Sequence, residues 1–454
     1  MSSKNRVSFG SRIGAVLAAA GSAVGLGNIW RFPYETGNHG GAAFIIIYLV
    51  CVFLLGIPVM MTEFAIGRHS KASTGEAFNV LAPGTWWKGV GYFGVLTGFL
   101  ILGYYAVVAG WTLHYIAQAA LNVFVDKTPE DYVSMFQTFS ANPYIPVLWA
   151  VAFLLITHWV IVKGVKEGIE RFSKLLMPLL FVLVVVLAIS SVCLPGASKG
   201  LAFLLKPDFS AVNADVFLGA LGQAFFSLSL GMGCLSTYAS YFSKETPLAK
   251  TAFTVSAIDT LVAIMAGLII FPAAFSVGIQ PDAGPSLIFI TLPNVFQQAF
   301  SGIPGLSYVF SVLFYVLLAL AALTSTISLH EVPTAFLHDK FGVSRTKCAR
   351  LVTIGCIVIA VFSSLSLGVM SDYTLFGKGC FDLLDFTTAK IMLPLAGLFS
   401  ALFVGWYLNK QISVDEMTNF GQHNAPYLSA FRFIIRYVAP ISIVVILFNE
   451  LGWL

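Results

Sequence analysis

Apolar residues run along most of this chain in segments long enough to cross a lipid bilayer. A bilayer span takes about 20 mostly apolar residues, and segments of this length recur here between short polar loops. The pattern predicts an all-α polytopic membrane protein with about eleven transmembrane helices. The expected helices centre near Val24, Leu54, Gly103, Ala152, Val184, Leu228, Ala263, Leu320, Ile359, Gly397 and Val444.

Glycine and polar residues interrupt two of the expected spans, the first and the sixth, near their middle. An unpaired backbone group in hydrocarbon costs on the order of several kcal/mol, so such a break indicates a cavity or a polar ligand. Close packing of small residues is the alternative explanation for either cluster alone. The first cluster holds Gly21, Ser22, Gly25, Gly27 and Asn28, and the second holds Ser227, Ser229, Gly231 and Gly233.

Broken helices at the first and sixth positions enter the membrane from opposite sides, which is typical of inverted-topology repeats in secondary transporters. We therefore expect a single membrane transporter domain over residues 1–454. Helices one to five would form the first repeat over 11–195, and helices six to ten the second over 212–409. An eleventh helix would follow over 427–454.

Charges in the loops alternate in sign along the chain and predict its orientation. Arg68, Lys166 and Arg345 lie in basic loops, whereas Glu130 and Asp131 lie in an acidic one. Because basic loops stay in the cytoplasm, the N-terminus is expected inside and the C-terminus outside the cell inner membrane. Only 10% of the residues are charged, against about 25% in soluble domains. The net charge of +4 is too small to suggest a nucleic-acid partner, and the cysteine spacing suggests no metal or redox motif.

A few polar side chains lie inside apolar segments and are candidates for a buried site. A charge at the depth of Asp259 costs upward of about 2.5 kcal/mol, which favours a cation ligand over a protonated or distantly paired acid. Glu63 is expected to accept hydrogen bonds from N–H groups that a broken helix leaves unpaired. The hydroxyls of Thr324 and Ser325 suit sodium, although bonding to a carbonyl one turn earlier is the alternative. Glu331 receives no role.

Residues on either side of the breaks suggest walls and an entrance. Tyr105 and Phe226 lie near the breaks, where aromatic rings either pack or close a pocket. Arg31 follows the first break and Asp385 opens the tenth helix, so we expect these two charges to pair across an entrance. Lys390 is a further intramembrane charge without an assigned role.

The string from Gly21 to Pro33, GSAVGLGNIWRFP, is the most specific motif in the chain. Together with further motifs it resembles the neurotransmitter:sodium symporter family, in the bacterial branch with eleven helices. The resemblance covers nearly the whole chain and implies the leucine-transporter fold. The further motifs are Gly41–Phe44, Gly56–Pro58 with Glu63 and Gly67-Arg68, Gly222–Gly231, Thr237–Tyr241 and Leu323–Ser325.

The resemblance also implies site residues and two sodium ions, with no organic cofactor. The first sodium would bind the Ala23 carbonyl, Asn28, Ser227, Asp259 and the substrate carboxylate; the second would bind the carbonyls of Gly21, Val24 and Ala321, with Thr324 and Ser325. Substrate would contact Ser22, Ala23, Leu26, Gly27, Ile101, Tyr105, Phe226, Ser227, Ser229, Met232, Ser325 and Leu329. Arg31 and Asp385 resemble an outer gate, and Arg6, Phe9, Ser240, Tyr241 and Asp339 an inner gate.

Two positions depart from the common family pattern. Asp259 stands where many members carry Asn, and Ala263 stands where chloride-dependent members carry Ser. Ala263 lacks a hydroxyl that could bind chloride, and Asp259 supplies a negative charge instead, so transport is predicted to be independent of chloride. Met232 replaces a bulkier aromatic residue, which favours large hydrophobic or aromatic side chains in the substrate.

The sequence therefore predicts a sodium-coupled symporter of neutral L-amino acids that works by alternating access in the lipid bilayer. Two alternatives remain open at this point. The first is a proton-coupled transporter of the same fold, and the second is an amino-acid receptor that does not transport. An enzyme is not expected, because no nucleophile and base appear at one depth.

Overall fold

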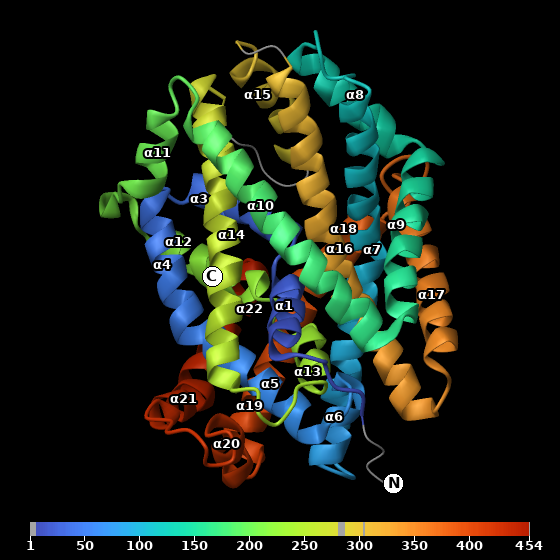
Figure 1. Cartoon of the computed structure of the whole chain (residues 1–454), viewed down its shortest axis with the longest axis vertical. Helices are drawn as coiled ribbons and strands as arrows, with labels where there is room; N and C mark the ends of the chain where they lie inside the picture. Colours follow the sequence, from blue (N-terminus) through green and yellow to red (C-terminus); the bar gives the residue numbers. More distant parts are fainter. Residues whose placement is uncertain (1–5, 280–286, 303–304, 454) are drawn as a thin grey trace.

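The computed structural model describes residues 6–279, 287–302 and 305–453, and this part of the chain is built from helices that run mostly along its long axis (Figure 1). An isolated bridge between Leu375 and Lys378 is the β contact of the described residues. Large apolar side chains such as Phe53 and Leu148 are more than half exposed on the outer surface of the bundle. Such a surface suits contact with lipid, so the predicted all-α membrane architecture is confirmed.

Nine helical spans among the described residues are long and apolar enough to cross a membrane. Several are joined from consecutive helical pieces. The spans are α4–η1–α5 (Ala42–Ser70), α7 (Lys88–Ala120), α9 (Ile145–Val162), η2–α10 (Val165–Val192), α14 (Leu248–Ser276), α16 (Leu306–Phe341), α17 (Arg345–Leu365), α18–η5–α19–η6 (Cys380–Tyr407) and α21–η7–α22 (Leu428–Glu450). Their pieces are α4 (Ala42–Cys51), η1 (Val52–Gly56), α5 (Ile57–Ser70), η2 (Val165–Glu170), α10 (Arg171–Val192), α18 (Cys380–Asp385), η5 (Phe386–Met392), α19 (Leu393–Leu402), η6 (Phe403–Tyr407), α21 (Leu428–Phe433), η7 (Ile434–Val438) and α22 (Ala439–Glu450).

The first and sixth expected spans are broken, as the sequence predicts. Helix α1 (Arg12–Ala23) meets the segment Leu26–Asn38 at a bend of 58°, and counting this pair as one span gives ten. That segment contains α2 (Leu26–Ile29) and α3 (Arg31–Asn38). The sixth span consists of two short helices, α12 (Ala214–Ser227) and α13 (Cys234–Ala239), and the break between them includes its expected centre, Leu228. Each of the two helices is too short to cross a membrane alone.

Short helices cover both ends of the bundle. Helices α6 (Thr74–Leu81) and α20 (Lys410–Met417) lie at the end that holds the N-terminus, at the bottom of Figure 1. Helices α8 (Pro129–Ala141), α11 (Ser198–Leu205) and α15 (Leu292–Ala299) lie toward the opposite end (Figure 1). The remaining short elements are η3 (Phe209–Ala211) and η4 (Leu287–Thr291).

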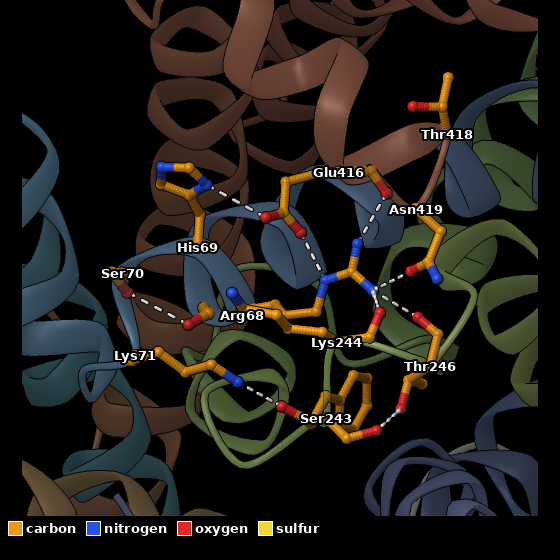
Figure 2. A network of polar contacts seen from close by, with 12 residues as sticks. Arg68, His69, Ser70, Lys71, Ser243, Lys244, Thr246, Glu416, Thr418 and Asn419 are labelled. Atoms are coloured by element: carbon orange, nitrogen blue, oxygen red, sulfur yellow. Dashed lines mark hydrogen bonds and ion pairs between the residues drawn. The ribbon is translucent and has the colours of Figure 1, made fainter. Parts of the chain in front are cut away.

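A buried polar network, the Arg68 clasp, ties three segments together at the N-terminal end (Figure 2). It consists of Arg68 on α5, Glu416 on α20, Asn419, and the backbone carbonyls of Lys244 and Thr246 in the loop that precedes α14. The Arg68 side chain is 1% exposed and that of Glu416 is 0% exposed.

The guanidinium of Arg68 uses almost all of its donors. Nε donates to Glu416 Oε2 at 2.5 Å and Nη2 donates to the Glu416 carbonyl at 2.8 Å. Nη1 donates to Asn419 Oδ1 at 2.9 Å and also to the Thr246 carbonyl. Next to it, Lys71 donates to the Phe242 carbonyl; burial lowers the pKa of this ammonium group, and the Arg68 charge lowers it further. Arg68 thereby fixes α20 and the loop before α14 against the end of α5.

We predict that Glu416→Gln destabilises the protein strongly, because it leaves the Arg68 cation buried without its counterion. Breaking a buried pair by removing one partner costs about 3–5 kcal/mol of unfolding free energy. The thermal melting point of the detergent-solubilised protein should fall clearly. The matched control is Glu167→Gln, which removes a carboxylate from an ion pair whose side chains are 77% and 75% exposed and should change little. Equal shifts for both variants would contradict the prediction.

Candidate functional site

The break between α1 and α2 is closed by side chains that accept hydrogen bonds from freed backbone groups. The Gly25 N–H donates to Asn28 Oδ1 at 2.8 Å, and the Leu26 N–H donates to the Tyr105 hydroxyl at 3.3 Å. A Cβ at Gly25 would lie 2.5 Å from Ser325 Oγ, so a side chain at this position would push the Ser325 hydroxyl out of its place. The predicted glycine-rich break is therefore also a point of close contact between helices.

The break between α12 and α13 uses left-handed backbone conformations. Ser229, Gly231 and Gly233 have φ angles of 54°, 84° and 73°. The Gly231 N–H donates to Glu63 Oε1 at 2.6 Å, which confirms the structural role expected for Glu63. Ser229 Oγ donates to the Ser22 carbonyl at 2.9 Å, so the two breaks touch each other.

Asn28, Ser227 and Asp259 form one buried polar cluster beside the breaks. Asn28 Nδ2 lies 2.7 Å from Asp259 Oδ1 and 3.3 Å from Ser227 Oγ. Ser227 Oγ donates to Asp259 Oδ2 at 2.8 Å. The three residues are at most 3% exposed. The structure thus brings together a carboxylate, a hydroxyl and an amide from three separate helices.

A second cluster of oxygen atoms joins α16 to the end of α1. Thr324 Oγ1 and Ser325 Oγ each lie 3.3 Å from the Val24 carbonyl oxygen. Thr324 Oγ1 also donates to the Ala321 carbonyl of its own helix at 2.9 Å. The hydroxyl therefore contacts one carbonyl on α16 and one at the end of α1. A Cβ at Gly21 would lie 3.3 Å from Thr324 Cβ, which places Gly21 against the same cluster.

Both clusters offer oxygen ligands, which hard cations prefer. Among residues 6–279, 287–302 and 305–453, no group of three or more His, Cys, Asp or Glu side chains is arranged to hold a metal ion. A transition-metal centre therefore has no candidate within these ranges, whereas the hydroxyl and carbonyl clusters suit an alkali cation.

A cavity lies between the two clusters. Every residue that the sequence assigns to substrate contact lines it, together with residues that the sequence reasoning missed, Cys234 and Leu393. Neither missed residue carries a polar or motif signal that could have indicated this position. The lining is Ser22, Ala23, Gly25, Leu26, Gly27, Asn28, Ile101, Tyr104, Tyr105, Phe226, Ser227, Ser229, Met232, Cys234, Ser325, Leu329 and Leu393.

Arg31, at the start of α3, lies over the ring of Phe226, which lines the cavity. Its guanidinium carbon is 4.4 Å from the centroid of the Phe226 ring, a cation–π distance. Within the described residues the ion pairs of Arg31 are with Glu35 and Glu450, and none is with Asp385, so the outer gate expected between Arg31 and Asp385 stays a prediction. The pairing depends on where α22 packs, and spacing along the sequence does not reveal this.

The predicted inner gate residues meet at the N-terminal end. Arg6 Nη1 lies 2.6 Å from Asp339 Oδ2, and the Arg6 guanidinium carbon is 4.8 Å from the Tyr241 ring centroid. The Phe9 N–H donates to the Tyr241 carbonyl at 3.0 Å. The Ser240 hydroxyl instead donates within its own helical segment, to the Thr237 carbonyl at 2.6 Å.

Glu331, which the sequence left without a role, supports this end of the molecule. Its side chain is 0% exposed. Oε1 accepts from the Tyr241 hydroxyl at 2.7 Å and from Arg345 Nη1 at 2.8 Å. The Tyr241 ring also contacts the Phe9 ring, at 5.9 Å between centroids. Glu331 therefore connects this aromatic pair to Arg345 on α17.

With this geometry in view, comparisons with known proteins agree with the motifs. A model of the sodium:neurotransmitter symporter family matches residues 6–129 and 133–452. The chain is 36% identical over 452 residues to YhdH, an uncharacterised sodium-dependent transporter of Bacillus subtilis, covering 100% of this chain and 99% of the relative. An uncharacterised sodium-dependent transporter of Haemophilus influenzae is 35% identical over 463 residues, or 99% of both proteins.

A solved structure is similar in fold as well as in sequence. The crystal structure of MhsT in complex with L-phenylalanine matches with a TM-score of 0.88 and 43% sequence identity, covering 98% of this chain and 100% of that one. The chain belongs to the sodium:neurotransmitter symporter family, and it is a sodium-dependent transporter with the leucine-transporter fold.

Proposed function

We propose that the protein carries neutral L-amino acids with large hydrophobic or aromatic side chains, together with sodium, by alternating access. The observation that carries this proposal is the cavity at the two helix breaks, which lies between two clusters of oxygen ligands. Broken helices hold substrate and ions in many secondary transporters, because freed backbone groups replace water as ligands. The complex of the similar MhsT with L-phenylalanine supports the substrate class.

The two oxygen clusters are the proposed sodium sites. One ion would bind the Ala23 carbonyl, Asn28, Ser227, Asp259 and the substrate carboxylate. The other would bind the carbonyls of Gly21, Val24 and Ala321 with the hydroxyls of Thr324 and Ser325. The bound carboxylate would join the first ion to the Tyr105 hydroxyl, so substrate and sodium stabilise each other.

The N-terminal end is proposed to face the cytoplasm, and the C-terminus to lie toward the outside of the cell inner membrane. The turn after α5 and the junction of α16 with α17 carry basic residues and lie toward the N-terminal end, whereas α8, with Glu130 and Asp131, lies at the opposite end (Figure 1). We retain 11–195 and 212–409 as the proposed inverted repeats, with the eleventh helix over 427–454.

The direct test is uptake into proteoliposomes. We expect leucine, phenylalanine, tryptophan and tyrosine to compete for labelled substrate far better than glycine or glutamate. The walls Ile101, Met232 and Leu329 offer apolar area without charge, and burying a large apolar side chain contributes about 1.5–3 kcal/mol. Equal competition by glutamate would contradict the assigned pocket. Uptake driven by a proton gradient alone would favour the proton-coupled alternative, and binding without uptake would favour a receptor.

We predict that Thr324→Ala combined with Ser325→Ala weakens sodium affinity by about thirtyfold or more. Each substitution removes a hydroxyl ligand from a site where a lost polar partner costs about 1–3 kcal/mol. The measurement is the sodium concentration at half-maximal substrate binding. The control is Thr254→Ala, because this hydroxyl donates to the Lys250 carbonyl in an exposed part of α14. An unchanged sodium affinity in the double variant would rule out the second proposed site.

We predict that transport needs no chloride and depends on the Asp259 carboxylate. Two sodium ions and a zwitterion bring net positive charge into a low-dielectric site, and Asp259 offsets it. Asp259→Asn should abolish most turnover in chloride-free buffer, and Asp259→Asn with Ala263→Ser should regain activity when chloride is added. Ala263→Ser alone serves as the control. A wild type that requires chloride, or normal chloride-free transport by Asp259→Asn, would contradict this prediction.

A further inference from the structure

The carboxylate of Glu450 lies between two cations, Arg31 and Lys390. Oε1 is 3.3 Å from Arg31 Nη2, and Oε2 is 2.9 Å from Lys390 Nζ. Arg31 begins α3, Lys390 lies in η5, and Glu450 ends α22. One side chain therefore links the first, tenth and last spans, and each of its oxygens is used by a different partner.

The same carboxylate also contacts the sixth span. A Cβ at Gly222 on α12 would lie 3.6 Å from Glu450 Oε1, so α12 leaves room for this side chain. Phe226 follows one turn later on α12 and lines the cavity. The Glu450 side chain thus lies against α3, which follows the break in the first span, and against α12, which precedes the break in the sixth.

Arg31 transmits this contact to the cavity. Its guanidinium carbon lies 4.4 Å from the centroid of the Phe226 ring. A Cβ at Gly27 would lie 2.8 Å from the same ring, so Gly27 also packs closely against it. Phe226 therefore packs against Gly27 and the Arg31 cation, which both belong to the first span. If Arg31 moved away from Glu450, the Phe226 ring would lose this cation–π contact.

We propose that Glu450 is a positioning residue of the outer gate: with Lys390 it holds Arg31 over Phe226, so the last helix takes part in closing the entrance. This inference rests on the proposed transport function only for the direction of gating. Glu35 also pairs with Arg31, at 3.6 Å, but it lies on the same helix and moves with it. Within the part of the chain that the structure describes, Glu450 is the carboxylate whose ion pair ties Arg31 to other helices.

The test is hydrogen–deuterium exchange of the full chain in sodium buffer, which needs no substrate. In Glu450→Gln we expect exchange in peptides covering 31–38 and 214–227 to rise about two- to fivefold, the range set by partly exposed ion pairs. Peptides covering 6–12 and 234–242 should not change. Where a labelled amino acid binds, its dissociation should accelerate by a similar factor while sodium affinity stays constant.

Glu35→Gln is the matched control, because it also removes a carboxylate from Arg31 but leaves the link between helices intact. An equal rise in Glu35→Gln, no rise in Glu450→Gln, or a rise at both ends of the molecule would overturn the inference. A rise confined to 31–38 and 214–227 in a protein that binds no amino acid would support the gate and contradict the proposed function.

Discussion

One constraint determines the rest of this structure: backbone groups freed at a helix break inside a bilayer must find partners within the protein. Water and lipid supply none at that depth. The freed N–H groups bond to Asn28, to Tyr105 on α7 and to Glu63 on α5, and the Val24 carbonyl meets the hydroxyls of α16. Three intact spans are therefore fixed around the breaks by the bonds that the breaks require.

The same constraint explains why the proposed cation and substrate sites are neighbours. Asn28 accepts from the Gly25 N–H through Oδ1 and donates to Asp259 through Nδ2, while the Val24 carbonyl meets Thr324 and Ser325. A ligand that engages either cluster acts on the same short stretch, Val24-Gly25. Two ligands that both stabilise one arrangement of a shared segment raise each other's affinity, and this is the physical form of coupling that symport needs.

The sequence predicted local features well because their causes are local. Glycine and serine within apolar runs located both breaks, and an isolated acid located the partner of the Gly231 N–H. The sequence did not reveal the partners of residues whose neighbours are set by packing between distant helices. Arg31 pairs with Glu450, far along the chain, and Lys390 and Glu331 have partners on other helices. Cys234 and Leu393 line the cavity because of helix position, and their side-chain chemistry gives no such signal.

Ion pairs hold both ends of the molecule, and their burial bears on what it costs to open each end. At the N-terminal end Glu331 is 0% exposed beside Arg345, and Arg6 and Asp339 are 15% and 17% exposed. At the other end Arg31, Glu450 and Lys390 are 23%, 18% and 43% exposed. Separating exposed charges costs little because water screens them, but separating buried charges requires their full resolvation. Of these charges Glu331 is the fully buried one, so separating it from Arg345 is the costly step at the proposed inner end. Opening the inner end requires ligands that bind the outer-closed form more tightly, since a ligand shifts an equilibrium only by its differential affinity.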